Sequence, residues 1–556
     1  MDNKNEIISS HIFVFPFRWD YISNGESVYG SIDKRLNVDK VGRILMESNC
    51  WEEDKPNIEN EEVEYNKYIY FYDNVRDAIY GKGKYRNIKK ELYHNFNKRS
   101  FLLREIIRKD IRNRVVQCFK YNKLNDKSTY NIKISKKEKI YSLNIKSIKL
   151  KIYDTGVAAL SFFLENYDQD STPEDILNIN DYGRRIFPQF LPLESVQNSF
   201  LAKNITLNLS NNKYSEEFNY DAKVCPNRIS NTIMKLLGDK FTYDEENLKK
   251  GQVFISPIMD DRMFLLSIYR NNNKSKGLIN PMGNSFKKSY EFWYKYIFVD
   301  NESLTCQDDE MFKELIKKST YLRWRNYGTF YGISRYSFVV LKNKNKSKED
   351  VLMNHFYTMY YEMALLVLIQ RASILRLSDE ASKIAIFDED EALENVKKLQ
   401  RYYTEFINDL YFREVTAQEQ GIEIYNKLVQ MMEIERDVKR LGEEIDGIQK
   451  YTSMISSERI STLLRIITYL GLGFTVCSFL IKVFGNDVIS FGEWNINDKF
   501  SSWLLERVMI SVAGIAIIIA LFKKVINSYY FKITKRIFWI AFIITFIILM
   551  FAKNWV

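Results

Sequence analysis

Residues 321–337 hold a dense group of side chains that could bind a phosphorylated ligand. The segment contains three arginines, two glycines and six aromatic residues. Arginine can grip a phosphate through two parallel hydrogen bonds, glycine lets a ligand approach the backbone closely, and aromatic rings can stack on a purine base. We therefore predict a nucleotide-binding site with ligand contacts from Arg323, Arg325, Tyr327, Gly328, Tyr331, Gly332 and Arg335.

A shorter segment of the same type, residues 180–186, adds Arg184 and Arg185 to the predicted ligand site. Both segments also fit a second interpretation, in which they are aromatic-rich stretches that pack within their own fold. For residues 321–337 this would be a tyrosine-rich hairpin that packs on its own sheet. The sequence leaves both interpretations open.

Catalytic chemistry finds little support in the sequence. It contains no Walker A motif, no Rossmann glycine pattern and no Gly-x-Ser-x-Gly elbow. Its five cysteines are far apart and it has three histidines, so no metal or disulfide spacing can be read. The acidic residues at 260–261 and 388–391 could bind a metal, although acidic runs on helices are usually solvated surface. We expect no enzyme activity, no metal site and no resident cofactor.

The net charge of +10 at pH 7 is concentrated near the C-terminus. Residues 461–556 contain ten lysines and arginines against four acidic residues, a balance of +6, which leaves +4 for the preceding 460 residues. An excess of +4 over 460 residues is too small to indicate a surface that binds a phosphate backbone. We expect no direct binding of nucleic acid.

Three apolar runs follow residue 460. Residues 466–481 and 537–552 are sixteen uncharged residues each, and residues 508–522 are fifteen. A spanning helix needs about 20 residues, a length that each run reaches with its flanks. We therefore predict transmembrane spans at 463–484, 503–522 and 537–555, with an interfacial position as the alternative for the third.

The loops between these spans predict an orientation. The loop 523–536 carries five basic residues and no acid, whereas the loop 485–502 carries three acids and one lysine. Because basic loops stay on the cytoplasmic side, we expect residues 1–460 and 523–536 in the cytoplasm and residues 485–502 outside. The expected localisation is a multi-pass protein of the inner or plasma membrane.

The first predicted span carries a polar stripe. Residues three, four or seven positions apart share one helical face, and this spacing predicts a pore lining of Arg465, Thr468, Gly471, Thr475, Ser478 and Lys482. Hydroxyl groups in membrane helices also serve as helix–helix hydrogen-bond partners. A packing face is therefore the alternative to a pore.

The rest of the chain predicts an α+β cytoplasmic domain followed by helices. Residues 141–153 alternate between apolar and polar, as a half-buried strand does, and aromatic-rich runs at 65–72 and 292–299 also read as strands. Residues 173–179 begin with cap residues and acids, which predicts a helix. We expect a ligand-sensing domain at 1–345, a helical bundle and stalk at 346–460, and a transmembrane domain at 461–556.

A long helix is predicted at 418–459. Apolar residues spaced alternately three and four apart give it the seam of a short coiled coil: Met431, Ile434, Val438, Leu441, Ile445 and Ile448. The seam fits a self-associating stalk that transmits motion, and it fits equally a helix that packs on its own domain.

A mixed domain, a helical bundle, a long helix and a C-terminal membrane domain together resemble the CorA family of cation channels. Residues 412–425 further resemble the diverged CorA-like effectors found beside type III CRISPR systems. The resemblance implies a homopentamer in the membrane that is opened by a nucleotide messenger, S-adenosylmethionine–AMP, in antiviral defence. The Gly-Met-Asn motif of typical CorA proteins is replaced here by residues 484–487, which read Phe-Gly-Asn-Asp. Constitutive transport of divalent cations is the first alternative, and a membrane-tethered scaffold or enzyme is the second.

Overall fold

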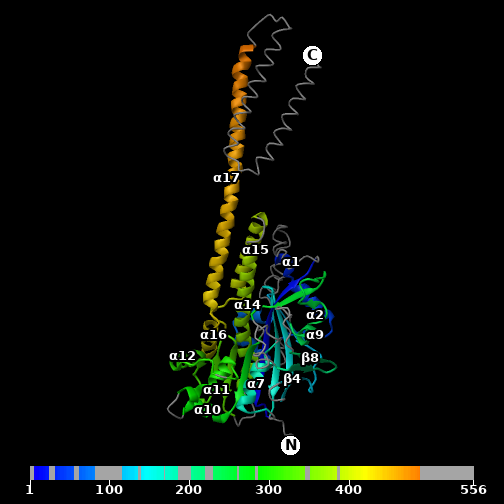
Figure 1. Ribbon diagram of the computed structural model, residues 1–556, viewed down its shortest axis with the longest axis vertical. Helices are drawn as coiled ribbons and strands as arrows, with labels where there is room; N and C mark the ends of the chain where they lie inside the picture. Colours follow the sequence, from blue (N-terminus) through cyan, green and yellow to red (C-terminus); the bar gives the residue numbers. More distant parts are fainter. Residues whose placement is uncertain are drawn as a thin grey trace. The chain divides into compact units, whose positions relative to one another are not determined.

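The computed structural model divides the chain into two compact units, residues 1–450 and residues 451–556. In the first unit one large sheet is covered by helices (Figure 1). The structure describes residues 6–23, 32–55, 62–81, 115–134, 139–167, 170–185, 202–218, 229–259, 262–281, 286–302, 304–344, 351–384 and 389–488.

The central strand of the sheet is β1 (Ser9–Tyr21). Along one edge it pairs antiparallel with β6 (Val157–Asn166). Along the other edge its first half pairs with β11 (Phe264–Arg270) and its second half with β10 (Val253–Pro257). The sheet therefore divides into two branches on this side of β1.

The same division occurs at β5 (Ile140–Tyr153), whose outer edge pairs first with β4 (Thr129–Lys133) and then with β3 (Val116–Tyr121). The other strands are β2 (Trp51–Glu53), β7 (Asn204–Asn208), β8 (Lys213–Glu217), β9 (Phe241–Thr242), β12 (Thr320–Tyr321), β13 (Phe330–Ile333) and β14 (Ser337–Lys342). Among the described residues, the longest path through the sheet is β12-β13-β14-β11-β1-β6-β5-β4-β7-β8.

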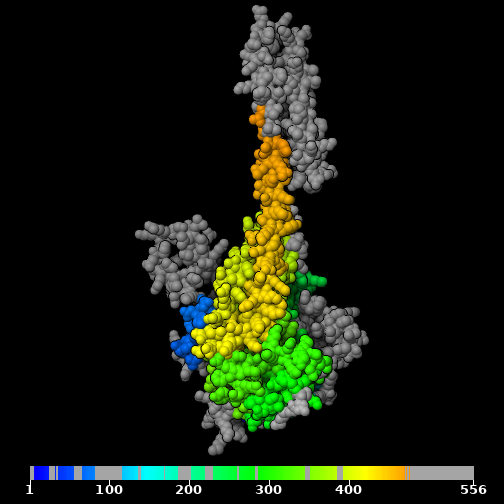
Figure 2. Space-filling view, turned by 90° about the vertical axis from the view of Figure 1, so that its left-hand side faces the viewer, coloured from blue at the N-terminus to red at the C-terminus, as the bar shows by residue number. Residues whose placement is uncertain are grey.

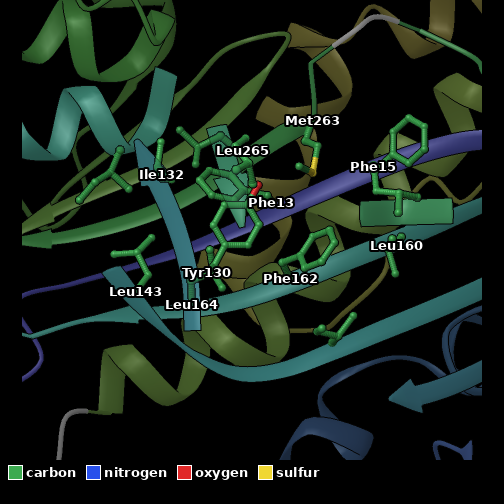
Figure 3. Packing of buried hydrophobic residues seen from close by; sticks show 14 of the residues in the cluster. Phe13, Phe15, Tyr130, Ile132, Leu143, Leu160, Phe162, Leu164, Met263 and Leu265 are labelled. Atoms are coloured by element: carbon green, nitrogen blue, oxygen red, sulfur yellow. The ribbon is translucent and has the colours of Figure 1, made fainter. Parts of the chain in front are cut away.

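Side chains alternate along β1 between two separate cores, because successive residues of a strand point to opposite faces. Phe13 and Phe15 enter the first core, where the Phe13 ring lies 5.9 Å from Tyr130 (Figure 3). The helices that contribute to this core are α2 (Val38–Glu47), α7 (Pro173–Gly183), α9 (Asn231–Leu237), α10 (Asn272–Ile279), α11 (Phe286–Phe298) and α12 (Asp309–Ser319).

Ile12 and Val14 of β1 enter the second core, which is built around α14 (Tyr361–Ile384). This helix continues directly from α13 (Val351–His355) through a π-helical turn, η2 (Phe356–Tyr360). The remaining helices are α1 (Ile32–Arg35), α3 (Glu62–Tyr70), α4 (Asp73–Tyr80), α15 (Glu389–Asp409), α16 (Glu419–Met431), α17 (Ile434–Val488) and a 3-10 turn, η1 (Arg325–Tyr327).

Two buried ion networks connect α14 to the strands and helices around it. Asp20 of β1 is fully buried and accepts hydrogen bonds from Arg35 and from Arg376 of α14. Lys151 of β5 lies 2.6 Å from Glu362, also on α14, and both side chains are buried. Because a buried charge without a partner is strongly unfavourable, these pairs hold α14 at one position on the sheet.

The mixed α+β architecture of the first unit is confirmed, and so are the strand at 141–153 and the helix that begins at residue 173. The side chain of Thr172 caps that helix by accepting a hydrogen bond from the backbone of Asp175. The strands predicted at 65–72 and 292–299 are wrong, because these residues belong mainly to α3 and α11.

The predicted helix at 418–459 is broken at Met432–Glu433, between α16 and α17. Ile434, Val438, Leu441 and Ile445 of the predicted seam are buried in the core around α14 and α15. Packing on the helix's own domain is therefore confirmed for these residues. Since they are already buried, they are not open to a second copy of the chain.

No helix among the described residues is long and apolar enough to cross a membrane. This finding corrects two predictions, the C-terminal transmembrane domain in the fold class and the multi-pass membrane localisation. The first predicted span, 463–484, lies in α17, and it reaches the about 20 residues of a spanning helix only when the flanks with Arg465 and Lys482 are counted. The predicted spans 503–522 and 537–555, the loop 523–536 and most of the loop 485–502 lie outside the described residues.

Candidate functional site

The predicted nucleotide segment lies at one edge of the sheet. It runs through β12, η1 and β13 and reaches the start of β14. β13 packs against α16, and in Figure 2 the green surface that includes this segment adjoins the yellow surface that includes α16. The site is therefore an interface between the sheet edge and the helices that lead into α17.

Arg323 forms the first half of this interface. Its Nη1 lies 2.7 Å from Glu423 and its Nη2 lies 2.9 Å from Glu419, so one guanidinium group bridges two carboxylates on successive turns of α16. The hydroxyl of Tyr321 also donates to Glu423. The Arg323 side chain is 35% exposed, which leaves the ion pairs accessible to solvent.

Arg335 forms the second half, at the junction of α16 and α17. Its Nη1 lies 3.0 Å from Glu433, and its Nη2 lies 4.0 Å from Asp437 in the first turn of α17. Glu433 has a φ of 58°, a left-handed conformation that is uncommon for a residue with a side chain. Arg335 therefore pairs with the residue at which the helical direction changes.

Between the two arginines, hydrogen bonds connect this edge to the core. The Trp324 indole donates to the side-chain oxygen of Gln420 on α16. The amide nitrogen of Gln420 donates to the hydroxyls of Tyr331 and Tyr360, at 3.2 and 2.6 Å. Tyr360 lies in the π-helical turn η2, a feature that is frequent at functional sites. Strand β13, helix α16 and the turn before α14 therefore meet at one glutamine.

The pKa shifts follow from these contacts. Hydrogen bonds from Tyr321 and Arg323 hold the pKa of Glu423 below its usual value. Hydrogen bonds to Glu423 and Glu419 raise the pKa of Arg323 above its usual range. Burial, aided by the charge of Arg335, lowers the pKa of Arg371, whose guanidinium donates to the Arg335 carbonyl. These shifts keep Arg323 and Glu423 ionised at neutral pH. We call Arg323, Arg335 and their carboxylate partners the nucleotide clamp.

Of the other predicted ligand residues in this segment, some contribute to packing and one lies at the surface. Arg325 donates to the carbonyl of Ile279 at the end of α10. Tyr331 is buried, and a Cβ at Gly332 would lie 2.4 Å from Ile297, so this glycine is required by packing. Tyr327, in contrast, is 75% exposed.

Gly328 ends the turn η1 in a left-handed conformation, with a φ of 74°. A Cβ at this position would lie 2.0 Å from the Asn343 side chain. Its carbonyl accepts a hydrogen bond from Ser275 of α10. The glycine is therefore explained by backbone geometry and close packing.

Arg184 and Arg185, the second predicted group, lie apart from this interface at the end of α7. Both are buried, and each has one guanidinium nitrogen 3.7–3.8 Å from Asp181. Arg184 also donates to the Val299 carbonyl, and Arg185 forms an isolated β-bridge with Arg262. These contacts favour the packing interpretation for this pair.

The predicted pore-lining residues lie in α17. Arg465, Thr468, Gly471 and Thr475 are exposed, and both threonine hydroxyls donate to carbonyls of their own helix at 2.7 Å. The side chains of Ser478 and Lys482 are outside the described part. A pore depends on the predicted membrane domain, so we do not propose it.

No group of acidic, histidine or cysteine side chains suited to hold a metal ion occurs among the residues that the structure describes. Asp260 and Asp261 lie outside those residues, as do the side chains of the acidic run 388–391.

Sequence reasoning missed the partners of the two arginines, which are Glu419, Glu423, Glu433 and Asp437. It also missed Gln420, the partner of Trp324. One signal was present, because Glu419 and Glu423 are four residues apart and so share a helical face. Nothing in the sequence connects that face with residues about 100 positions earlier.

Comparisons with known proteins leave the family open. No model of a protein family matches the chain, and no curated protein matches it. Among solved structures, the CorA magnesium transporter from Methanocaldococcus jannaschii is similar at a TM-score of 0.21 and 11% identity, over 48% of this chain and 92% of that chain. Similarity this low shows no shared fold, so no argument rests on it. The predicted homo-oligomer and the link to CRISPR systems stay predictions.

Proposed function

We propose that residues 1–450 form a control module that binds an adenine nucleotide and passes the binding event to α17. The module acts without catalysis, by changing the contacts of a helix. By the resemblance described above, the ligand would be a messenger such as S-adenosylmethionine–AMP, and the setting would be type III CRISPR defence.

The observation that carries this proposal is the pairing of Arg323 and Arg335 with four carboxylates on α16 and at the start of α17. The carboxylates occupy the positions that phosphate oxygens of a ligand would take. Solvent-exposed ion pairs are individually weak and screened by salt, whereas a phosphate can accept two charge-assisted hydrogen bonds from one arginine. A phosphorylated ligand can therefore compete with Glu419, Glu423 and Glu433.

Two aromatic rings at the turn η1 provide a surface on which the adenine part of the ligand can stack. The rings of Trp324 and Tyr327 lie 5.8 Å apart, and both are exposed. Stacking of a base on an aromatic ring is sequence-tolerant and contributes about 1–3 kcal/mol. A nucleotide with its base at Tyr327 and its phosphates at Arg323 would leave α16 without its two ion pairs to Arg323.

Calorimetry on the full chain tests this function with ATP, AMP and S-adenosylmethionine–AMP as ligands. We expect at least one of them to bind, and Arg323→Ala to weaken that binding about tenfold to a hundredfold, the loss expected for one charge-assisted contact. Arg401→Ala, which removes an exposed arginine with its own acid partner on α15, should bind like the parent.

A chain that binds none of the three ligands would instead be a scaffold in which the arginines only fasten α16. The same conclusion would follow if Arg323→Ala and the parent bound with equal affinity.

A further inference from the structure

A groove of about 1200 Å³ lies between α10, α11 and the start of α7, on residues that the proposed nucleotide site does not use. These helices contact one another at the lower end of the first unit in Figure 1. Small-molecule sites are typically about 300–1,000 Å³, so the groove is large enough for a multiply charged small molecule.

Four lysines line the groove, Lys274 and Lys276 from α10 and Lys288 and Lys295 from α11. Lys295 is neutralised by Glu291, 2.9 Å away. Lys274, Lys276 and Lys288 form no ion pair with any residue in the described part of the chain. Three lysines without an ion-pair partner therefore lie on one concave surface, which Glu174, Glu291 and Glu302 also line.

The remaining lining supplies hydrogen-bond donors and one aromatic surface. Asn273, Asn280 and Asn301 add side-chain amides. Phe292 is half-buried, and its ring lies 5.0 Å from the Lys274 ammonium group. Ammonium and amide donors together suit phosphate oxygens, because lysine binds phosphate as a point charge and needs no fixed geometry.

The charge distribution argues against nucleic acid as the occupant. A phosphate-backbone surface needs basic side chains along a track, whereas the first 460 residues carry a balance of only +4. The groove also contains Glu174, Glu291 and Glu302, which would repel a continuous backbone. A compact ligand with clustered phosphates needs only the three lysines and no continuous basic track.

We infer that this groove is a binding site for a small polyphosphorylated molecule, with phosphate contacts from Lys274, Lys276 and Lys288. The site is separate from the nucleotide clamp and stands without it. It is nevertheless connected to the clamp through α10, because Ser275 donates to Gly328 at 2.6 Å and Arg325 donates to Ile279 at 3.0 Å. An occupant of the groove would thus contact the helix that supports the turn η1.

Calorimetry with inorganic tripolyphosphate as the probe tests the site on the full chain. We expect binding that weakens as salt rises, and a loss of about a hundredfold or more in the double variant Lys276→Ala/Lys288→Ala, at about tenfold for each lost contact. Both lysines are exposed, so their removal leaves the fold intact. The double variant Lys313→Ala/Lys317→Ala on α12 removes equal charge outside the groove and should stay within about twofold of the parent.

Arg323→Ala separates this site from the proposed function, because it should leave the tripolyphosphate binding that depends on Lys276 and Lys288 within about twofold of the parent. Three results would overturn the inference. They are no binding of tripolyphosphate at millimolar concentration, unchanged binding in Lys276→Ala/Lys288→Ala, and an RNA 20-mer that binds more tightly than tripolyphosphate and depends on the same two lysines.

Discussion

Asp20→Ala is expected to lower the free energy of unfolding by about 3–5 kcal/mol, the range measured when one partner of a buried ion network is removed. The Asp20 carboxylate is fully buried and lies 2.5 Å from Arg35, 2.6 Å from Arg376 and 2.8 Å from Arg18. Burial raises its pKa, and the guanidinium groups of Arg18 and Arg35 oppose that rise. Without Asp20, the fully buried Arg376 keeps Glu380, at 3.4 Å, as its one ion-pair partner among the residues that the structure describes.

Urea unfolding of the parent and the variant measures this difference. Asp379→Ala is the matched control, because Asp379 pairs with Arg18 in the same network but its side chain is 45% exposed. An exposed partner contributes about 0–1 kcal/mol, so the control should remain close to the parent. Equal losses in both variants would contradict the account of a buried network around Asp20.

Stability is also expected to fall as the pH decreases from about 6.5 to 4, because of His11. This side chain is fully buried between Ser9, 2.9 Å from Nε2, and Asn180, 2.6 Å from Nδ1. Burial lowers the pKa of His11 to about 4, against the raising effect of the Asn180 hydrogen bond. In the unfolded chain its pKa returns to about 6.5, so below that pH the unfolded state binds the extra proton.

The size of this effect follows from linkage. The contribution of His11 to stability is complete above the pKa of His11 in the unfolded chain, about 6.5. It is lost progressively as the pH falls to the pKa in the folded chain, about 4. The total loss in the free energy of unfolding is on the order of 3 kcal/mol. Urea unfolding at pH 7.5, 6 and 5 should show the loss in the parent. His11→Gln should lower stability at every pH but reduce the slope, and a slope equal to that of the parent would show that His11 does not titrate on unfolding.

The sequence predicts elements best where side-chain periodicity and burial agree. In β5, Tyr141, Leu143 and Ile145 alternate with polar residues, and the structure buries all three in one core. In α11, by contrast, aromatic and β-branched residues suggest a strand, yet Trp293, Tyr296 and Ile297 are buried at the three- and four-residue spacing of a helix. Composition misleads there, and the helical period is the better signal.

The sequence indicates which residues of the candidate site to consider, but it does not predict their contacts. Arg323 and Arg335 stand out in the sequence because they lie among glycines and aromatic residues. Their carboxylate partners come from α16 and α17, and pairing over about 100 residues depends on how those helices pack against β13. The break at Glu433 was equally hidden, because a left-handed residue without glycine leaves no mark in the sequence.

Hydrogen–deuterium exchange of α16 and the first turns of α17 tests the central claim most directly. If a nucleotide displaces the carboxylates from Arg323 and Arg335, amides in residues 419–441 should exchange faster when the ligand is bound. The double variant Arg323→Ala/Arg335→Ala should show the same faster exchange without ligand, because it lacks the same ion pairs. Exchange in residues 419–441 that stays unchanged or slows at saturating nucleotide would contradict the claim that ligand binding releases these helices from the sheet.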